Sequence, residues 1–225
     1  MSIKENWLAV KERVAESAVR SGRAPAAITI IAVTKYVGSA AINEAIEAGV
    51  TDIGENRVQD ALAKFPGLKG NVVKHLIGSL QTNKVKPAIT EFDLIHAVDR
   101  SELVVELTKQ AVKLQRDVKF LIQLNISGET TKHGLTPREL SELIKLAKDY
   151  PNLIPCGLMT MAPLSDNPET SRPIFRELAE IFSEAAVRFS LGTSWQYLSM
   201  GMSQDFEVAV EEGANYIRVG TAIFK

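Results

Sequence analysis

The sequence has little of several features that mark particular classes of protein. Its 225 residues include one cysteine, Cys156, so no internal disulfide can form and a reducing, cytoplasmic location is expected. The first residues are charged where a signal peptide needs an apolar core, and no apolar run approaches the roughly 20 residues that cross a bilayer. Acidic residues number 27 against 26 lysines and arginines, so the overall charge favours neither a nucleic-acid nor a membrane partner.

Motifs for metals and dinucleotides are also missing. The three histidines, His75, His96 and His133, lack the spacing of a metal-binding motif, and no metal site is expected. No Gly-x-Gly-x-x-Gly turn follows the first predicted strand. Hydrophobic residues make up 45% of the chain, but aromatic residues only 6%. A core of small aliphatic residues suits strands buried on both faces and the helices that pack on them.

Hydrophobic patterning predicts strands that alternate with helices. A first helix is expected over 3–21, where apolar residues recur at helical spacing before Ser21-Gly22. Eight strands are predicted at 28–33, 52–54, 72–77, 94–98, 118–125, 154–159, 197–200 and 216–219. Helices are predicted between them at 40–48, 58–64, 82–88, 101–115, 137–148, 169–189 and 204–212.

This alternation indicates an α/β protein with parallel strands and right-handed crossovers. Eight such strands can close into a single (β/α)8 TIM-type barrel, here with an extra N-terminal helix, as one domain over residues 1–225. An open doubly wound sheet is the alternative, and its usual glycine-rich turn is absent. In a barrel the functional face lies at the C-terminal ends of the strands, so the residues there are the candidates for a site.

Lys35 follows the first predicted strand directly. A lysine amine that loses its charge beside apolar neighbours or another cation is a nucleophile that forms a Schiff base with an aldehyde. A solvated lysine that merely ends a strand is the alternative. Without further residues, the position of Lys35 does not decide between the two.

The last two predicted strands both end in small, hydroxyl-bearing turns. Ser199, Gly201 and Ser203 follow or end the seventh strand, and Gly220-Thr221 follows the eighth. Barrel phosphate sites are commonly built from these two loops, because free N–H groups at helix starts bind phosphate. In this interpretation Gly201 lets the backbone approach a ligand, and Ser203 caps the helix that contains Asp205.

Arg218 lies within the eighth strand, where a charged side chain needs a partner. It either donates to a pyridine nitrogen of a cofactor, which would keep that nitrogen unprotonated, or forms a salt bridge, for example to Glu55. His75 is placed inside or near the site, as a structural histidine or a cofactor neighbour. Met159 is expected in the cofactor wall, and Cys156 is expected as a small buried residue rather than a nucleophile.

Six motifs in this order resemble the pyridoxal 5′-phosphate (PLP) homeostasis proteins, which are single-domain relatives of the alanine racemase barrel. They are Ala-Val-Thr-Lys at 32–35, Gly-Glu-Asn-Arg-Val-Gln at 54–59, His-Leu-Ile-Gly-Ser-Leu-Gln-Thr-Asn-Lys at 75–84, Gly-Leu-Met-Thr-Met-Ala at 157–162, Ser-Met-Gly-Met-Ser at 199–203 and Arg-Val-Gly-Thr-Ala-Ile-Phe at 218–224. The resemblance covers nearly the whole chain. One departure is Ser79, where many relatives carry histidine.

The resemblance implies PLP on Lys35, Arg218 at the pyridine nitrogen, Asn56 beside the ring and Met159 in the wall. It implies a phosphate held by Ser199, Gly201, Ser203, Gly220 and Thr221. The implied role is in PLP (vitamin B6) and amino-acid homeostasis, with PLP-dependent apoenzymes as possible recipients of the cofactor, a monomeric state and no catalytic residues.

Two enzymatic alternatives remain. A PLP-dependent amino-acid racemase would need a second base, for which Tyr36 or Tyr197 could stand in, and the sequence is expected to lack a second domain that would cover the site. A Schiff-base aldolase on a phosphorylated substrate would use the lysine and the phosphate site but would not need Arg218 at a ring nitrogen.

Overall fold

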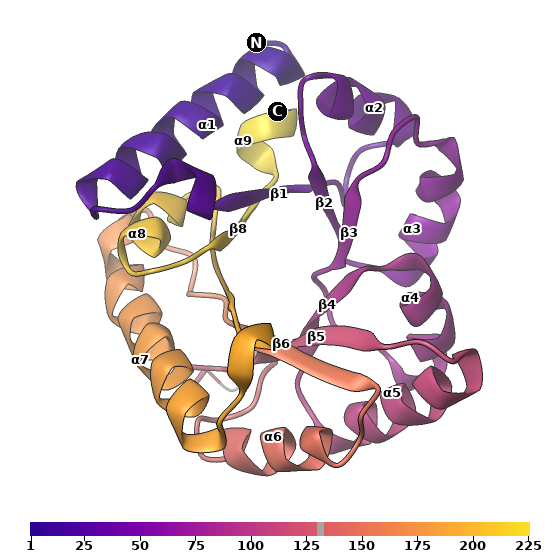
Figure 1. Ribbon diagram of the computed structural model, residues 1–225. Coiled ribbons are helices and arrows are strands. Elements are labelled where there is room, and N and C mark those ends of the chain that lie inside the picture. The colour runs from indigo at the N-terminus through magenta and orange to yellow at the C-terminus, as the bar shows by residue number, and fades with distance from the viewer. Residues whose placement is uncertain (130–132) are drawn as a thin grey trace.

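A computed structural model describes residues 1–129 and 133–225. Its centre is a closed barrel of eight strands in which each strand pairs in parallel with the next and β8 pairs with β1 (Figure 1). The strands are β1 Thr29–Val33, β2 Asp52–Glu55, β3 Val73–Leu76, β4 Leu94–Val98, β5 Val118–Gln123, β6 Leu153–Met159, β7 Tyr197–Met202 and β8 Tyr216–Val219. The predicted (β/α)8 fold class is thereby confirmed.

Helices surround the strands on the outside, as Figure 1 shows. They are α1 Ile3–Arg20, α2 Ser39–Glu47, α3 Val58–Lys64, α4 Val85–Glu91, α5 Ser101–Leu114, α6 Leu140–Lys148, α7 Arg172–Phe189, α8 Phe206–Glu211 and α9 Thr221–Phe224. No helix in the described ranges is both long and apolar enough to span a membrane. The apolar residues between strands and helices form the larger core, and a smaller cluster around Ile31, Leu121 and Tyr216 forms a second one.

The N-terminal helix is fixed at its start and to the end of the chain. Ser2 and Glu5 form a capping box, in which each side chain accepts a hydrogen bond from the backbone N–H of the other residue. The side-chain amide of Asn6 donates to the carbonyls of Ile223 and Lys225, which belong to α9 and the residue after it. Helix α1 therefore packs along α8 and α9 (Figure 1).

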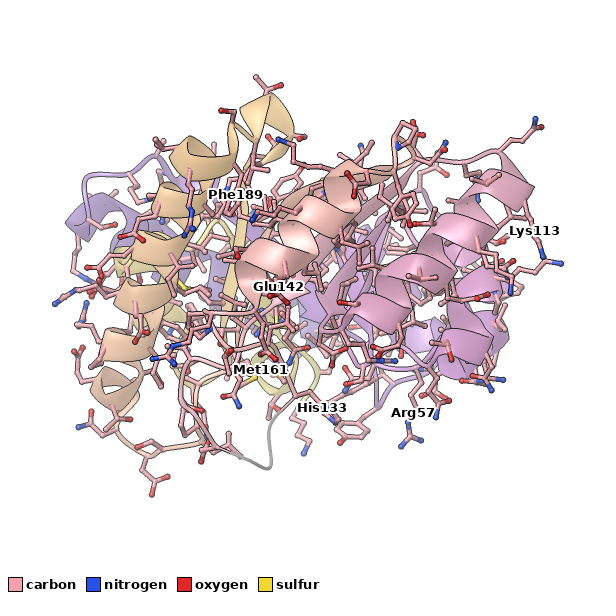
Figure 2. The ribbon with its side chains drawn as sticks, turned by 90° about the horizontal axis from the view of Figure 1, so that it is seen from below. Arg57, Lys113, His133, Glu142, Met161 and Phe189 are labelled. Carbon is pink, nitrogen blue, oxygen red and sulfur yellow. The ribbon has the colours of Figure 1, made fainter. Side chains whose placement is uncertain are left out.

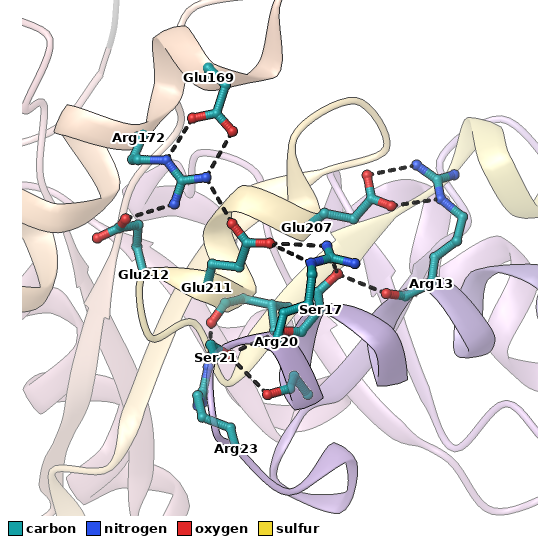
Figure 3. A network of polar contacts seen from close by, with 12 residues as sticks. Arg13, Ser17, Arg20, Ser21, Arg23, Glu169, Arg172, Glu207, Glu211 and Glu212 are labelled. Carbon is teal, nitrogen blue, oxygen red and sulfur yellow. Dashed lines mark hydrogen bonds and ion pairs between the residues drawn. The ribbon is translucent and has the colours of Figure 1, made fainter.

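A network of ion pairs joins α1, α7 and α8 on the surface (Figure 3). Arg172 at the start of α7 contacts three carboxylates, those of Glu169, Glu211 and Glu212. Arg20 on α1 contacts Glu211 from the other side at 3.0 Å. Because these carboxylates surround it, the pKa of Arg172 is raised above its usual value. The network connects the helices that flank β7 and β8 and so supports the strands that end in the predicted phosphate loops.

The predicted element boundaries need two corrections at these loops. Strand β7 continues to Met202, and α8 begins only at Phe206 with Asp205 as its N-cap residue. The prediction that Ser203 caps this helix was therefore wrong: its hydroxyl accepts a hydrogen bond from the N–H of Gly220 on the neighbouring loop, at 3.2 Å. Helix α9, a short helix at the end of the described chain, follows β8.

Candidate functional site

A cavity of about 770 Å³ opens at the end of the barrel where the strands finish. Figure 2 shows this end at the bottom, where Met161, His133 and Arg57 are labelled, whereas Phe189 at the end of α7 lies at the opposite end. Six of the predicted site residues line the cavity: Lys35, Asn56, Ser203, Arg218, Gly220 and Thr221. Four others, His75, Met159, Ser199 and Gly201, do not line it.

Lys35 lines the cavity, and its amine has no charged partner among the described residues. Within the described residues it forms no ion pair, and its Nζ lies 5.0 Å from the centroid of the adjacent Tyr36 ring. Lys64 on α3, in contrast, has partners for its amine: its Nζ lies 2.8 Å from Oε1 of Glu55 and donates to the carbonyl of Thr34. Glu55 therefore neutralises Lys64 and leaves the amine of Lys35 free for another group.

Glu55 and Thr34 also hold the backbone that leads to Lys35. The hydroxyl of Thr34 donates to Oε1 of Glu55 at 2.6 Å, and both side chains are fully buried. The second carboxylate oxygen of Glu55 is buried without a hydrogen-bond partner. Among the described residues Glu55 pairs with Lys64 and forms no salt bridge with Arg218, the pair that the sequence left open.

Arg218 is a buried cation at the floor of the cavity. Its side chain donates to Oγ of Ser199 at 2.7 Å and to the carbonyl of Thr160 at 2.8 Å. In residues 1–129 and 133–225 no carboxylate forms an ion pair with it. Burial lowers the pKa of Arg218 to about 10, and the negative charge of Asp205 opposes this change. A guanidinium of this kind favours an uncharged or anionic acceptor inside the cavity.

Ser199 lies inside the barrel and not at the cavity surface, contrary to the predicted phosphate contact through its side chain. Its hydroxyl is fully buried and lies 3.0 Å from Nδ1 of His96 in addition to its bond with Arg218. His75 is buried deeper, between His96 and Asp52. Met159 belongs to the second core cluster, so its side chain packs inside the barrel and does not form the cavity wall.

Gly201 has a structural reason to be glycine that differs from the predicted one. Its φ of +90° is disfavoured for other residues, and a Cβ atom there would lie 2.5 Å from Cβ of Ala209 on α8. The close approach that the structure shows is to helix α8. Asp205 shapes the loop that follows, since its carboxylate accepts from the N–H of Met202 and from the hydroxyl of Ser171.

Several residues of the cavity were not singled out from the sequence. Gln123 at the end of β5 lines it and donates to the carbonyl of His133 at 2.9 Å. Ile77, Pro163 and Phe224 add apolar surface. A polar residue near the end of a predicted buried strand was the available signal for Gln123. The apolar residues carried none, because they look like core in the sequence.

The two tyrosines considered as a second base lie in different places. Tyr36 lines the cavity beside Lys35 and is 84% exposed. Tyr197 does not line the cavity, and its ring stacks on Tyr216 at 4.4 Å between centroids, within the second core cluster. Burial next to Tyr197 raises the pKa of Tyr216 above its usual value. Cys156, as predicted, is buried, and burial raises its pKa to about 11.

The family model for the alanine racemase N-terminal domain matches residues 2–225. The pyridoxal phosphate homeostasis protein of Aquifex aeolicus is 40% identical over 225 residues, which are 100% of this chain and 98% of the relative. The protein of the same name from Pseudomonas aeruginosa is 36% identical over 99% of this chain and 95% of its own length. The chain belongs to the pyridoxal phosphate homeostasis protein family. The resemblance inferred from the six motifs is thus confirmed.

Solved structures agree with this family membership. PipY of Synechococcus elongatus PCC7942 with PLP bound matches with a TM-score of 0.83 and 36% identity, over 96% of this chain and 100% of PipY. An alanine racemase of Clostridium difficile matches with a TM-score of 0.74 at 13% identity, over 56% of its chain, and so shares the barrel fold. Among the described residues of this family member, no group of three or more metal-ligating side chains is arranged to hold a metal ion.

Proposed function

We propose that this protein binds pyridoxal 5′-phosphate in the cavity, holds it as a Schiff base on Lys35, and takes part in PLP and amino-acid homeostasis. The observation that carries the proposal is that Lys35 and Arg218 line the same cavity. In the described residues the amine of Lys35 has no ion-pair partner, and the buried guanidinium of Arg218 has no carboxylate partner. The aldehyde of PLP can react with the amine of Lys35, and its ring nitrogen can accept a hydrogen bond from Arg218.

The residues that line the cavity from the loops after β7 and β8 fit a phosphate. Ser203, Gly220 and Thr221 line it together, from the loops after β7 and β8. The N–H groups of Thr221 and Ala222 begin α9 and have no acceptor within that helix. Donors of this kind bind phosphate in barrels. Asn56, which directly follows β2, also lines the cavity, and we propose that it contacts the ring.

Relatives support both the ligand and the role. Those of 36–40% identity are named pyridoxal phosphate homeostasis proteins, and PipY has been solved with PLP bound. We infer that this chain likewise stores PLP or supplies it to PLP-dependent apoenzymes, as a monomer. Mixing the PLP-loaded protein with an apoenzyme of this class and following its reactivation tests the transfer. Reactivation no faster than PLP release into a trapping agent would contradict direct delivery.

We propose further that the protein binds PLP without enzyme-like turnover. PLP supplies an electron sink for chemistry at the α-carbon of amino acids, and racemisation there needs a second base across from the lysine. Tyr36 is adjacent to Lys35 in the sequence and Tyr197 does not line the cavity. Asp205 lines it, but its two oxygens already accept hydrogen bonds from Met202 and Ser171.

Exchange of the α-hydrogen of L-alanine in deuterated water tests the absence of turnover. The PLP-loaded protein is expected to exchange it far more slowly than about 1 per second, the lower range of enzymes. Lys35→Ala with added PLP gives the background rate. Exchange at about 1 per second or faster, lost in Lys35→Ala, would identify the protein as an enzyme.

A further inference from the structure

A chain of buried polar side chains crosses the interior of the barrel and ends at Arg218. Oδ1 of Asp52 lies 3.0 Å from Nε2 of His75, Nδ1 of His75 lies 3.0 Å from Nε2 of His96, and Nδ1 of His96 lies 3.0 Å from Oγ of Ser199. Nη1 of Arg218 then lies 2.7 Å from the same Ser199 oxygen. We call these five residues the interior relay. Nothing in the binding of PLP described above uses its first three members.

The relay connects strands that are far apart in the barrel. Asp52 begins β2, His75 and His96 lie in β3 and β4, and Ser199 and Arg218 lie in β7 and β8. Strands β4 and β7 are not neighbours, so the contact between His96 and Ser199 passes through the barrel interior. Only Arg218 of the five lines the cavity, while both histidines and Ser199 are fully buried.

The two ends of the relay fix the direction of its hydrogen bonds. A guanidinium only donates, so Arg218 donates to Ser199 and leaves the serine hydrogen to point at Nδ1 of His96. A carboxylate only accepts, so Nε2 of His75 carries the hydrogen that faces Asp52. With both imidazoles neutral, Nε2 of His96 then donates to Nδ1 of His75, and all four contacts are satisfied in one direction.

The environment of His96 is consistent with a neutral ring. Burial, followed by the proximity of His75 and Arg218, lowers the pKa of His96 well below 6.5. Asp52 is held in turn, because its other oxygen accepts from the hydroxyl of Thr51 at 2.7 Å. Each member of the relay therefore has one defined orientation, and Ser199 contacts the guanidinium of Arg218.

We propose that Asp52, His75 and His96 are positioning residues for Arg218: through Ser199 they hold its guanidinium in one orientation, so that the N–H groups not bonded to Ser199 and Thr160 face a hydrogen-bond acceptor in the cavity. This rests on the proposed function, in which the acceptor is the pyridine nitrogen of PLP. Residues of β2, β3 and β4 thus act on a contact that Arg218 makes from β8. The relay selects a ligand with an unprotonated ring nitrogen, because a protonated one would put a donor against a donor.

If the relay served only to satisfy buried polar groups, its loss would lower the stability of the protein but would not change how PLP is bound. The test therefore measures the ring nitrogen of bound PLP and the affinity for PLP. PLP labelled with 15N in the ring is bound to the unmodified protein, to Asp52→Asn and to Ser199→Ala, and the 15N resonance of the ring nitrogen and the PLP dissociation constant are recorded. Cys156→Ala is the control, because Cys156 is also buried within the barrel but is not a member of the relay.

Both relay variants are expected to shift the ring-nitrogen resonance in the same direction and to weaken PLP binding by about twofold to tenfold, the range of one net hydrogen bond. Cys156→Ala should leave the resonance in place. If Asp52→Asn and Ser199→Ala lower the melting temperature but leave resonance and affinity as in the unmodified protein, the relay is only structural and the proposal is wrong. Ser199→Ala alone decides the question if Asp52→Asn does not fold.

A second measurement needs no PLP and separates this proposal from the proposed function. In the unmodified protein the guanidinium N–H resonances of Arg218 should be sharp and resolved, because rotation is restricted, and in Asp52→Asn they should broaden. Failure of the unmodified protein to bind PLP would contradict the proposed function, whereas an unchanged guanidinium signal in Asp52→Asn would contradict the positioning role.

Discussion

The side chains of Arg218 and Ser199 meet inside the barrel, with Nη1 2.7 Å from Oγ. This contact places a cation at the floor of a cavity without giving it a counter-ion. The lowering of its pKa from 12.5 to about 10 corresponds to a cost on the order of 3 kcal/mol for the charged form. A group that opposes folding in this way is expected where a ligand needs it.

Arg218→Met should therefore separate stability from binding. Without PLP, the variant is expected to be as stable as the unmodified protein or more so, because it removes an unpaired buried charge. Its PLP affinity should fall by about tenfold or more, as expected when a hydrogen bond from a charged donor is lost. Chemical denaturation and a PLP titration measure the two quantities. Destabilisation by more than about 2 kcal/mol would show that Arg218 has mainly a structural role.

The proposed phosphate site can be tested with two serines that both line the cavity. Ser203 accepts a hydrogen bond from Gly220 between the two predicted phosphate loops, whereas Ser165 accepts one from Asn167 elsewhere on the rim. Ser203→Ala should weaken PLP binding by about 1 kcal/mol, and pyridoxal should bind far more weakly than PLP. Ser165→Ala should change little. Equal effects of the two substitutions would argue against a phosphate beside Ser203.

Stability should depend on pH through His96. Its pKa is lowered well below 6.5 in the folded protein, so below pH 6.5 the unfolded chain binds a proton that the folded chain does not. Above this pH, His96 should therefore make no pH-dependent contribution to the free energy of unfolding. The free energy of unfolding should fall as the pH drops from about 6.5 to 5, by at most about 1.4 kcal/mol per pH unit for this group.

Denaturation curves at several pH values, for the unmodified protein and for His96→Gln, measure this dependence. The variant should be less stable at neutral pH and should have a shallower slope between pH 6.5 and 5. Above pH 5 most carboxylates remain ionised, so the difference between the two proteins reports the histidine. Parallel slopes would mean that His96 is protonated in the folded state.

The ion pair between Lys64 and Glu55 should matter more than those on the surface. Glu55 is fully buried, so Lys64→Met leaves a buried carboxylate whose strongest remaining partner is the Thr34 hydroxyl. The expected loss is about 3 kcal/mol. The double variant Glu55→Gln with Lys64→Met should recover most of it, because the charge is removed as well. A loss below about 1 kcal/mol in the single variant would contradict this account.

The sequence was sufficient for the barrel and for six residues that line the cavity: Lys35, Asn56, Ser203, Arg218, Gly220 and Thr221. They could be placed because strand ends in a parallel barrel meet at one mouth, whatever the details of packing. Ser199 could not, since one residue of strand register decides whether a side chain faces the interior or the outside, and β7 continues past its predicted end. The interior relay was invisible for the same reason: its members come from five strands, and only their pairing brings them together.

The conformation of the short loops after β7 and β8 was the other feature that the sequence did not predict. Ser203 has the residue type of a helix cap, but Asp205 takes the N-cap position and Ser203 bonds across to Gly220. A choice between two capping residues two positions apart depends on contacts with the neighbouring loop, which local sequence does not contain.

The most direct test of the account is to locate PLP on the chain. The PLP-loaded protein is reduced with borohydride, digested and analysed by mass spectrometry, with Lys35→Ala treated in parallel. The account predicts a single predominant adduct on Lys35 and its loss from a Lys35→Ala protein that remains folded. An adduct found mainly on Lys64 or Lys84, or one of equal yield in Lys35→Ala, would contradict it.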